Sequence, residues 1–277
     1  MPTQPWTLDG PILLVGCGKM GSAMLQGWLS SGLPATHILV QEPTPSADLT
    51  AFCAANGISL AATQTPSSAP SVLIMAIKPQ AMATVFPALA GLAAPDTITL
   101  SIAAGKPIAS FATLLPEGAA IVRAMPNTPA AIGRGITVLC PNANVTPDQR
   151  ALCERLMAAV GEVGWVADET LMDAVTAVSG SGPAYVFLLA EAMTKAGINA
   201  GLDAALAAKL ARATIAGSGE LMRQSPAIDA ATLRQNVTSP GGTTAAALDV
   251  LMASDGLPSL MDRAISAATA RGKTLAK

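Results

Sequence analysis

Short apolar runs recur through the first half of the chain, and segments with helical spacing separate them. The spacing of apolar and polar positions predicts helices over residues 20–29, 48–55 and 80–89, each bounded by Gly, Pro or Ser. Strands and helices therefore alternate, which is typical of a parallel, doubly wound sheet. The predicted strands are Ile12–Val15, Ile38–Gln41 and residues 72–77, 97–102 and 121–125.

The pattern changes after about Asp168. Two further apolar runs, at residues 136–140 and 162–166, flank a helix that begins near Pro147, and they could extend the sheet. Beyond Asp168 the strand signals stop, and turns rich in Gly, Ser and Pro separate helical segments. We therefore expect an α/β Rossmann-type dinucleotide-binding domain over residues 1–167 and an all-α domain over residues 168–277. A length of 277 residues also favours two domains.

Composition narrows the possible partners. Apolar residues make up 51% of the chain, but no apolar stretch approaches the ~18 residues that a membrane-spanning helix requires. The net charge is −2, and no basic run resembles a nucleic-acid footprint. We therefore expect a small-molecule ligand, no membrane and no nucleic acid. The many alanines favour an extensive subunit interface, and the absence of a secretory signal pattern predicts a cytoplasmic protein.

Cysteine and histidine usage argues against metal chemistry. The four cysteines, Cys17, Cys53, Cys140 and Cys153, are scattered without the paired spacing of a metal site, and buried thiols are the simpler interpretation. His37 is the single histidine of the chain. The sequence therefore predicts no metal, and it disfavours a Ser-His-Asp catalytic site.

A glycine-rich segment has the context of a dinucleotide-binding loop. It reads Gly16-Cys17-Gly18-Lys19-Met20-Gly21, follows the strand Ile12–Val15 and opens the next helix. Glycines permit a tight turn and close approach of the backbone to a ligand, and the helix N-terminus attracts an anion. We therefore predict that Gly16, Gly18, Lys19, Met20 and Gly21 bind the cofactor pyrophosphate.

Glu42 ends the second predicted strand about twenty residues beyond Gly21. An acidic side chain there can hydrogen-bond the adenosine ribose 2′-OH and so favour NAD, although a solvated carboxylate before Pro43 is an equal alternative. No Lys or Arg occurs from Met20 to Ile77. A 2′-phosphate would therefore rely on Thr44, Ser46, backbone amides or a residue from elsewhere, and the choice between NADH and NADPH stays open.

Five further segments point to a named family. Three of them end predicted strands, and the other two lie in the helical half. Together they closely resemble pyrroline-5-carboxylate reductases from about Ile12 to the final helix, and the last segment is the most specific. The segments are Ala76-Ile77-Lys78-Pro79-Gln80, Ser101-Ile102-Ala103-Ala104-Gly105, Met125-Pro126-Asn127-Thr128-Pro129, residues 179–185 (SGSGPAY) and residues 236–244 (NVTSPGGTT).

The resemblance implies NAD(P)H-dependent reduction of 1-pyrroline-5-carboxylate to L-proline, the last step of proline biosynthesis. It also implies that the all-α domain is a dimerisation and substrate domain that interlocks with a second subunit. A homodimer results, and five dimers often form a decamer. The cofactor contacts that it implies, beyond the glycine loop, are Ala76, Ile77, Lys78, Pro79, Ala103, Ala104, Gly105 and Asn127. Gln64 stands where many members carry an Asn near the adenine.

The last segment, Ser239-Pro240-Gly241-Gly242-Thr243-Thr244, precedes a predicted helix over residues 245–252, so hydroxyls and backbone N–H groups meet at a helix N-terminus. That arrangement is a ready anion site, and a plain capped helix is the alternative. By resemblance, Ser239, Gly241, Gly242, Thr243 and Thr244 bind the substrate, and the Thr244 hydroxyl is the catalytic group that hydrogen-bonds the ring nitrogen.

Two other functions remain possible. One is a β-hydroxyacid dehydrogenase or another imine reductase, since these also join a dinucleotide-binding domain to a helical domain. A β-hydroxyacid dehydrogenase would need a catalytic lysine in a glycine-rich helix, and neither Lys195 nor Lys209 has that context. A protein that only senses the nucleotide would not need the anion turn of the second domain. Tyr185, the only tyrosine, fits core or dimer packing better than a catalytic phenol.

Overall fold

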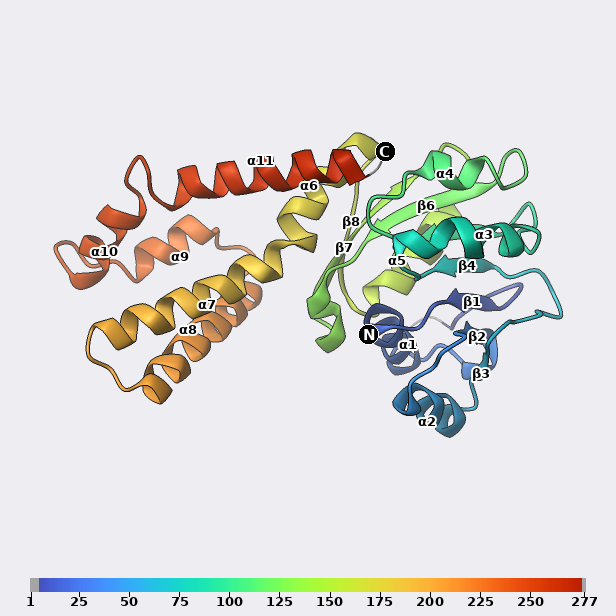
Figure 1. Cartoon of the computed structure of the whole chain (residues 1–277), viewed down its shortest axis with the longest axis horizontal. Helices are drawn as coiled ribbons and strands as arrows, with labels where there is room; N and C mark the ends of the chain where they lie inside the picture. Colours follow the sequence, from blue (N-terminus) through green and yellow to red (C-terminus); the bar gives the residue numbers. More distant parts are fainter. Residues whose placement is uncertain (1–4, 276–277) are drawn as a thin grey trace. The chain divides into compact units, whose positions relative to one another are not determined.

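The computed structural model describes residues 5–275, which fall into two compact units (Figure 1). The first unit runs to Gly180 and includes the last turns of the C-terminal helix from Thr269. The second unit is Ser181–Ala268. The predicted division at residue 168 precedes this boundary, because η4 (Glu169–Leu171), α6 (Met172–Val175) and the π-helical turn η5 (Thr176–Gly180) cluster with the first unit.

A single sheet of eight strands forms the centre of the first unit, as far as the described residues show. Its order is β3-β2-β1-β4-β5-β6-β7-β8, and its strands are parallel except for the antiparallel pair β6–β7. The parallel part confirms the predicted doubly wound fold. The strands are β1 (Ile12–Val15), β2 (Ile38–Gln41), β3 (Ser59–Ala61), β4 (Val72–Met75), β5 (Ile98–Ser101), β6 (Ala120–Met125), β7 (Gly135–Pro141) and β8 (Gly161–Trp165).

Helices cover both faces of this sheet (Figure 1). The buried side chains of α1 (Lys19–Ser30), α2 (Ala47–Asn56) and α5 (Pro147–Ala158) pack on one face, and those of α3 (Met82–Ala90) and α4 (Ile108–Ala112) pack on the other. Trp28 is fully buried, and its Nε1 donates to the carbonyl oxygen of Leu156 at 2.9 Å. This bond fixes α1 against α5.

The first unit differs from the predicted strands and helices in three places. Strand β3 was not expected, because its three residues are half-exposed and carry little apolar signal. The five-residue helix α4 was also not expected. The connection from β6 to β7 contains only a short 3-10 segment, η3 (Thr128–Ile132), which is too short for a parallel crossover, so β7 returns antiparallel.

The second unit is helical. Its elements are α7 (Gly182–Asn199), α8 (Ala204–Gln224), α9 (Ala230–Asn236), α10 (Thr243–Leu251) and most of α11 (Leu257–Leu275). Within it, α7 packs along α8 (Figure 1). Among its described residues only Ala207 and Ala211 are buried, whereas α7 exposes Val186, Phe187, Leu188, Leu189 and Met193.

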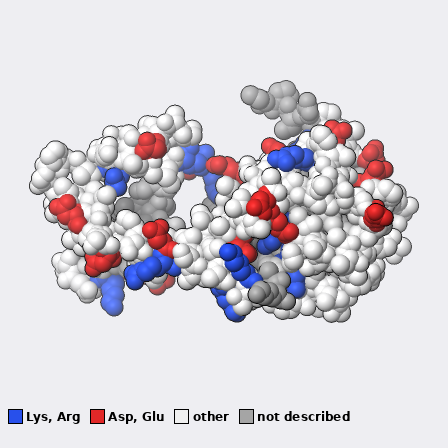
Figure 2. Space-filling view, turned by 90° about the horizontal axis from the view of Figure 1, so that it is seen from above, with Lys and Arg blue, Asp and Glu red and all other residues white. Residues whose placement is uncertain are grey.

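Charge is sparse on the face that Figure 2 shows, where Lys, Arg, Asp and Glu stand singly or in small groups among uncharged residues. No basic patch of the kind that binds nucleic acid gathers on that face (Figure 2). Among the described residues, no helix is both long and apolar enough to cross a membrane.

Candidate active site

The glycine loop (residues 16–21) connects β1 to α1, and its three glycines have three different structural reasons. Gly16 has φ +86°, a conformation that favours glycine, and a Cβ there would lie 2.7 Å from the Ala76 oxygen. A Cβ on Gly21 would lie 2.7 Å from the Gly16 oxygen, so α1 needs a glycine to approach β1. A Cβ on Gly18 would meet nothing within 4 Å, because Gly18 faces open space.

This arrangement fits a dinucleotide. Its first glycine makes the turn, its third allows helix–strand packing, and the open side of its second leaves room for a pyrophosphate. Gly18 is the N-cap of α1, and Lys19 and Met20 begin the helix. The N–H groups of a first helical turn lack partners inside the helix, and they lie at the positive end of its dipole. The loop therefore has the donors that a diphosphate requires.

The other predicted cofactor segments follow the neighbouring strands β4, β5 and β6. Strand register pairs Val15 with Met75, Met75 with Ser101 and Ser101 with Arg123, so the carboxyl ends of these strands lie level with one another. Strand order also reverses at β1 and β4, which is where dinucleotides bind such sheets. The structure therefore brings the four predicted cofactor segments to one edge of the sheet.

The segment after β4 holds four of the predicted residues. Ala76 donates its N–H to the Val15 oxygen at 2.8 Å, and Ile77 lies against Gly16. Lys78 is the exposed N-cap of η2 (Pro79–Ala81), and Pro79 is the first residue of that turn. The expected helix over residues 80–89 thus starts as a 3-10 turn.

The segment after β5 is built around a left-handed glycine. Ala103 is buried and Ala104 is exposed, while Gly105 has φ +71°. A Cβ on Gly105 would lie 3.8 Å from the backbone of Leu275, so the end of α11 lies beside this loop. Gly272 packs against Asp173 of α6 so closely that a Cβ would come within 2.9 Å of the carboxylate.

Asn127, after β6, uses its side chain within the protein. Its Oδ1 accepts from the Ile136 N–H at 2.9 Å, and its Nδ2 donates to the Ser179 oxygen at 3.3 Å. The carboxamide thereby ties the end of β6 to β7 and to the π-helical turn η5. These bonds hold the 127 loop in place, while the predicted contact of Asn127 with the cofactor stays a prediction.

Glu42 directly follows β2 and reaches the glycine loop. Its Oε2 accepts from the Cys17 N–H at 2.9 Å, and its Oε1 accepts from the Thr44 N–H at 3.2 Å and from the Thr44 hydroxyl at 3.4 Å. The neighbouring Cys17 thiol is 5% exposed, and burial raises its pKa to about 11. Cys17 is thus a neutral, packed side chain, and its backbone amide holds the carboxylate.

Gln64, where the sequence departs from the family pattern, closes the same end of β2. Its Nε2 donates to the carbonyl oxygens of Val40 and Ser59 at 2.9 and 3.1 Å. Its backbone N–H donates to Gln41 Oε1 at 3.0 Å. Gln64 therefore fixes the edge of the sheet through its own hydrogen bonds.

An ion pair between a buried arginine and a half-buried glutamate was missed in the sequence. Arg123, in the middle of β6, is 5% exposed, and its Nη1 lies 3.0 Å from Glu169 Oε1. The same oxygen accepts from the Ile108 N–H at 2.9 Å. An arginine inside an otherwise apolar strand is the signal that should have predicted a buried partner.

The predicted substrate turn (residues 239–244) lies in the helical unit. Gly242 donates its N–H to the Ser239 oxygen at 3.0 Å, and Gly241 has φ +68°, which explains the Pro-Gly order of the turn. Helix α10 begins at Thr243, two residues before the predicted start at residue 245, with Gly242 as its N-cap and Thr244 in its first turn. The hydroxyls of Ser239 and Thr244 have no hydrogen-bond partner among the described residues. The turn thus presents two hydroxyls and the N–H groups of a helix N-terminus.

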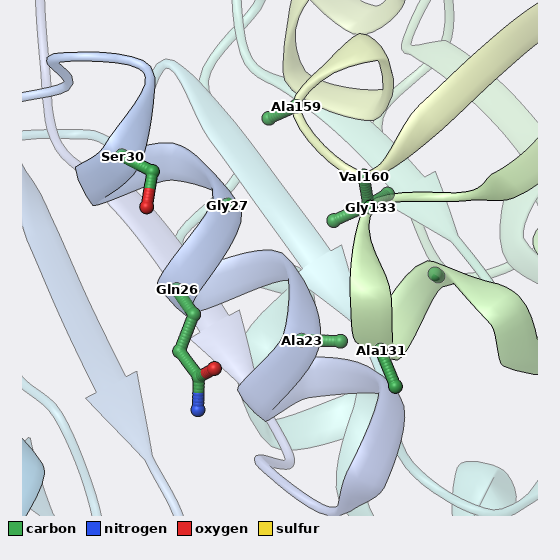
Figure 3. A pocket seen from close by; sticks show the side chains of 9 residues that line it. Ala23, Gln26, Gly27, Ser30, Ala131, Gly133, Ala159 and Val160 are labelled. Atoms are coloured by element: carbon green, nitrogen blue, oxygen red, sulfur yellow. The ribbon is translucent and has the colours of Figure 1, made fainter.

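Two other features lie outside these segments. A shallow depression of about 240 Å³ lies between α1, η3 and the two residues that join α5 to β8, and mostly small side chains line it (Figure 3). It has no titratable lining residue, and it does not include the glycine loop. Tyr185 lies in the first turns of α7 and is half-buried there. The described residues hold no cluster of three or more His, Cys, Asp or Glu that could bind a metal.

Comparisons with known proteins agree with this arrangement. Residues 11–105 match the family model described as NADP oxidoreductase coenzyme F420-dependent, and residues 169–275 match pyrroline-5-carboxylate reductase dimerisation. The chain is 40% identical to pyrroline-5-carboxylate reductase from Pseudomonas aeruginosa, covering 96% of this chain and 97% of that protein.

Solved structures extend the likeness to the whole fold. A pyrroline-5-carboxylate reductase from Coxiella burnetii has a TM-score of 0.89 at 33% identity, covering 97% of this chain and 99% of that one. A pyrroline carboxylate reductase from Plasmodium falciparum, solved with NADP bound, has a TM-score of 0.78 at 26% identity over the same shares.

Proposed function

We propose a substrate-binding mode from one premise, which is that this chain belongs to the pyrroline-5-carboxylate reductase family. It is an NAD(P)H-dependent oxidoreductase of proline biosynthesis, and it reduces the C=N bond of 1-pyrroline-5-carboxylate to give L-proline. The bound dinucleotide supplies the hydride. The residues of the chain must hold the substrate anion and present one face of the imine carbon.

The substrate carboxylate binds at the substrate turn (residues 239–244). The Ser239 hydroxyl and the backbone N–H groups of Gly242, Thr243 and Thr244 hold it, while Gly241 shapes the turn through its positive φ. The observation that carries this proposal is the pair of hydroxyls, on Ser239 and Thr244, that have no hydrogen-bond partner among residues 5–275 and lie at the start of α10. A helix N-terminus stabilises an anion through its dipole and its free N–H groups.

The Thr244 hydroxyl is the donor to the ring nitrogen. No Asp, Glu, Lys or His occurs in the turn, so the turn supplies no strong acid. None is required, because the neutral imine can take its proton from solvent while the hydroxyl donates to its nitrogen. If the substrate binds as the iminium, the hydroxyl oxygen accepts from the iminium N–H instead, and either bond orients the nitrogen. Thr244 therefore acts by positioning and by stabilising the nitrogen as its charge changes.

The cofactor contacts lie along the sheet edge described above. The pyrophosphate binds at Gly16, Gly18, Lys19, Met20 and Gly21, and the open side of Gly18 supports this placement. The segments after β4, β5 and β6 face the nicotinamide half, where the backbone and stem of Lys78 contact its ribose. The remaining contacts are Glu42, Ala76, Ile77, Pro79, Ala103, Ala104, Gly105 and Asn127.

The chain forms an oligomer through its dimerisation region. The finer proposal is a homodimer, with a decamer of five dimers as its higher form. Support comes from the helical unit, whose buried residues, among those described, are Ala207 and Ala211, too few for an independent core. We place the functional boundary at residue 168, one residue before the matched dimerisation region. Four buried free thiols support a cytoplasmic location.

Paired hydroxyl deletions test the substrate-binding mode. Thr244→Ala removes one hydrogen bond in the transition state, so kcat should fall roughly five- to a hundred-fold, and Thr244→Ser should recover much of the rate. Ser239→Ala should act mainly on substrate KM. Thr238→Ala is the matched control, since the Thr238 hydroxyl donates to the Arg234 oxygen at 2.7 Å instead of facing a ligand. Wild-type kcat and KM in Thr244→Ala would show that this hydroxyl has no part in the reaction.

A further inference from the structure

The end of β2 carries negative charge where a cofactor adenosine ribose would bind. Glu42 has no ion-pair partner among the described residues, and Asp48 follows it in the first turn of α2. The sequence has no Lys or Arg between residues 20 and 77 to offset these carboxylates. Any group that binds beside Glu42 therefore meets an uncompensated anion.

The Glu42 carboxylate is also held in place. The Cys17 N–H binds Oε2 at 2.9 Å, and the Thr44 N–H binds Oε1 at 3.2 Å. These bonds draw the carboxylate toward the glycine loop, so it cannot turn away without leaving two backbone donors unpaired. A carboxylate accepts hydrogen bonds and donates none when ionised, so a ribose hydroxyl suits its free lone pairs and a phosphate does not.

Thr44, which could otherwise donate to a 2′-phosphate, already donates to Glu42. Its N–H binds Oε1 at 3.2 Å and its hydroxyl binds the same oxygen at 3.4 Å. The Ser46 oxygen accepts from the Leu49 N–H at 3.2 Å, so Ser46 retains only the single O–H of its side chain as a donor. Rejection of the phosphate thus combines repulsion by Glu42 with a shortage of donors, and acceptance of the ribose hydroxyl needs no rearrangement.

We propose that Glu42 is the specificity-determining residue for the cofactor and makes this enzyme selective for NADH over NADPH. This inference rests on the proposed cofactor site and concerns only the adenosine end of it. The carboxylate accepts a hydrogen bond from the ribose 2′-OH, and the same carboxylate repels the two negative charges of a 2′-phosphate. The selectivity is therefore electrostatic. It arises at the end of β2, beside the adenosine ribose, and not at the residues that contact the nicotinamide half of the cofactor.

Binding measurements test this without turnover. Calorimetric titration of the wild-type enzyme with NAD⁺ and with NADP⁺ should give a Kd ratio of roughly tenfold or more in favour of NAD⁺. Glu42→Ser should shift that ratio by roughly tenfold or more toward NADP⁺. Glu42→Gln, which keeps the shape of the side chain and can still accept from Cys17, should shift it less. Raising the salt concentration should narrow the wild-type ratio, because screening weakens the repulsion.

Asp48→Asn is the matched control, since it removes a carboxylate from the same region without touching the glycine loop. Its Kd ratio should stay within roughly twofold of wild type. A wild-type preference for NADP⁺, or an unchanged ratio in both folded Glu42 variants, overturns the proposal. If neither nucleotide binds wild type, the cofactor site itself fails. If proline forms equally well with NADH and NADPH, the reductase function stands and only the selectivity fails.

Discussion

A Cβ atom on Gly21 would lie 2.7 Å from the carbonyl oxygen of Gly16, so α1 can approach the end of β1 only because position 21 lacks a side chain. A Cβ atom on Gly18, which lies between them in sequence, would meet nothing within 4 Å. The glycines of the loop therefore have two separate functions. Gly16 and Gly21 allow the backbone of the loop and α1 to pack closely, and Gly18 leaves space for the ligand.

We predict that Gly18→Val will greatly weaken cofactor binding while leaving the fold intact, because Gly18 has φ −71° and open space where the side chain would go. That side chain would occupy the volume that a pyrophosphate needs. Calorimetric titration with NAD⁺ and NADP⁺ should show a loss of at least roughly tenfold in affinity, and the melting temperature should change by only a few degrees.

Gly21→Val is the contrasting variant. Its side chain collides with backbone, so the free energy of unfolding should fall by roughly 1–3 kcal/mol or more. Unchanged nucleotide affinity in a folded Gly18→Val variant would refute the assignment of the loop to the pyrophosphate.

The helical unit should depend on a second subunit for its stability. Phe187 on α7 is 63% exposed, and its apolar neighbours on the helix are exposed as well. These side chains need the surface of another subunit to cover them. We predict that Phe187→Glu will shift the protein toward monomer in sedimentation velocity and lower its activity by roughly tenfold or more. Ile132→Glu is the matched control, because Ile132 is 76% exposed in the first unit. A fully active monomer would contradict the proposed dimer.

Stability should fall in alkali because of the buried thiols. Burial raises the pKa of Cys153 from 9.0 to about 12, so the folded state disfavours the thiolate. The resulting stability is present below pH 9.0 and is lost as pH rises toward 12, by up to ~1.4 kcal/mol per pH unit. Denaturant titrations from about pH 8 to about pH 10.5 should show this slope, reduced in Cys153→Ala. Equal slopes in both proteins would exclude a contribution from Cys153.

The sequence predicted those parts of the fold whose conformation is determined by a short segment of the chain. The strand Ile12–Val15 and the loop after it follow from an apolar run and spaced glycines, which specify a turn whatever the rest of the chain does. The start of α10 after Gly242 follows in the same way. By contrast, β3 and α4 are too short to show a period, and packing against the sheet decides them.

Pairings between distant segments were not predictable from the sequence. Nothing near Glu42 in sequence indicates that its carboxylate binds the Cys17 amide, because the contact arises only when β2 lies beside β1. Asn127 likewise meets Ser179 through the folded sheet, 52 residues along the chain. Side-chain roles of this kind depend on topology, which fixes the neighbours only after the strands are in order.

This chain reduces 1-pyrroline-5-carboxylate to L-proline with a nicotinamide cofactor. The decisive measurement follows the oxidation of NADH and of NADPH by the loss of reduced-nicotinamide absorbance, and it quantifies L-proline by chiral amino-acid analysis in the same reaction. We expect L-proline in amounts equal to the reduced cofactor consumed, with NADH the better hydride donor. Cofactor oxidation without proline, or oxidation of 3-hydroxyisobutyrate with NAD⁺ or NADP⁺ by a protein that does not reduce the imine, would contradict this function.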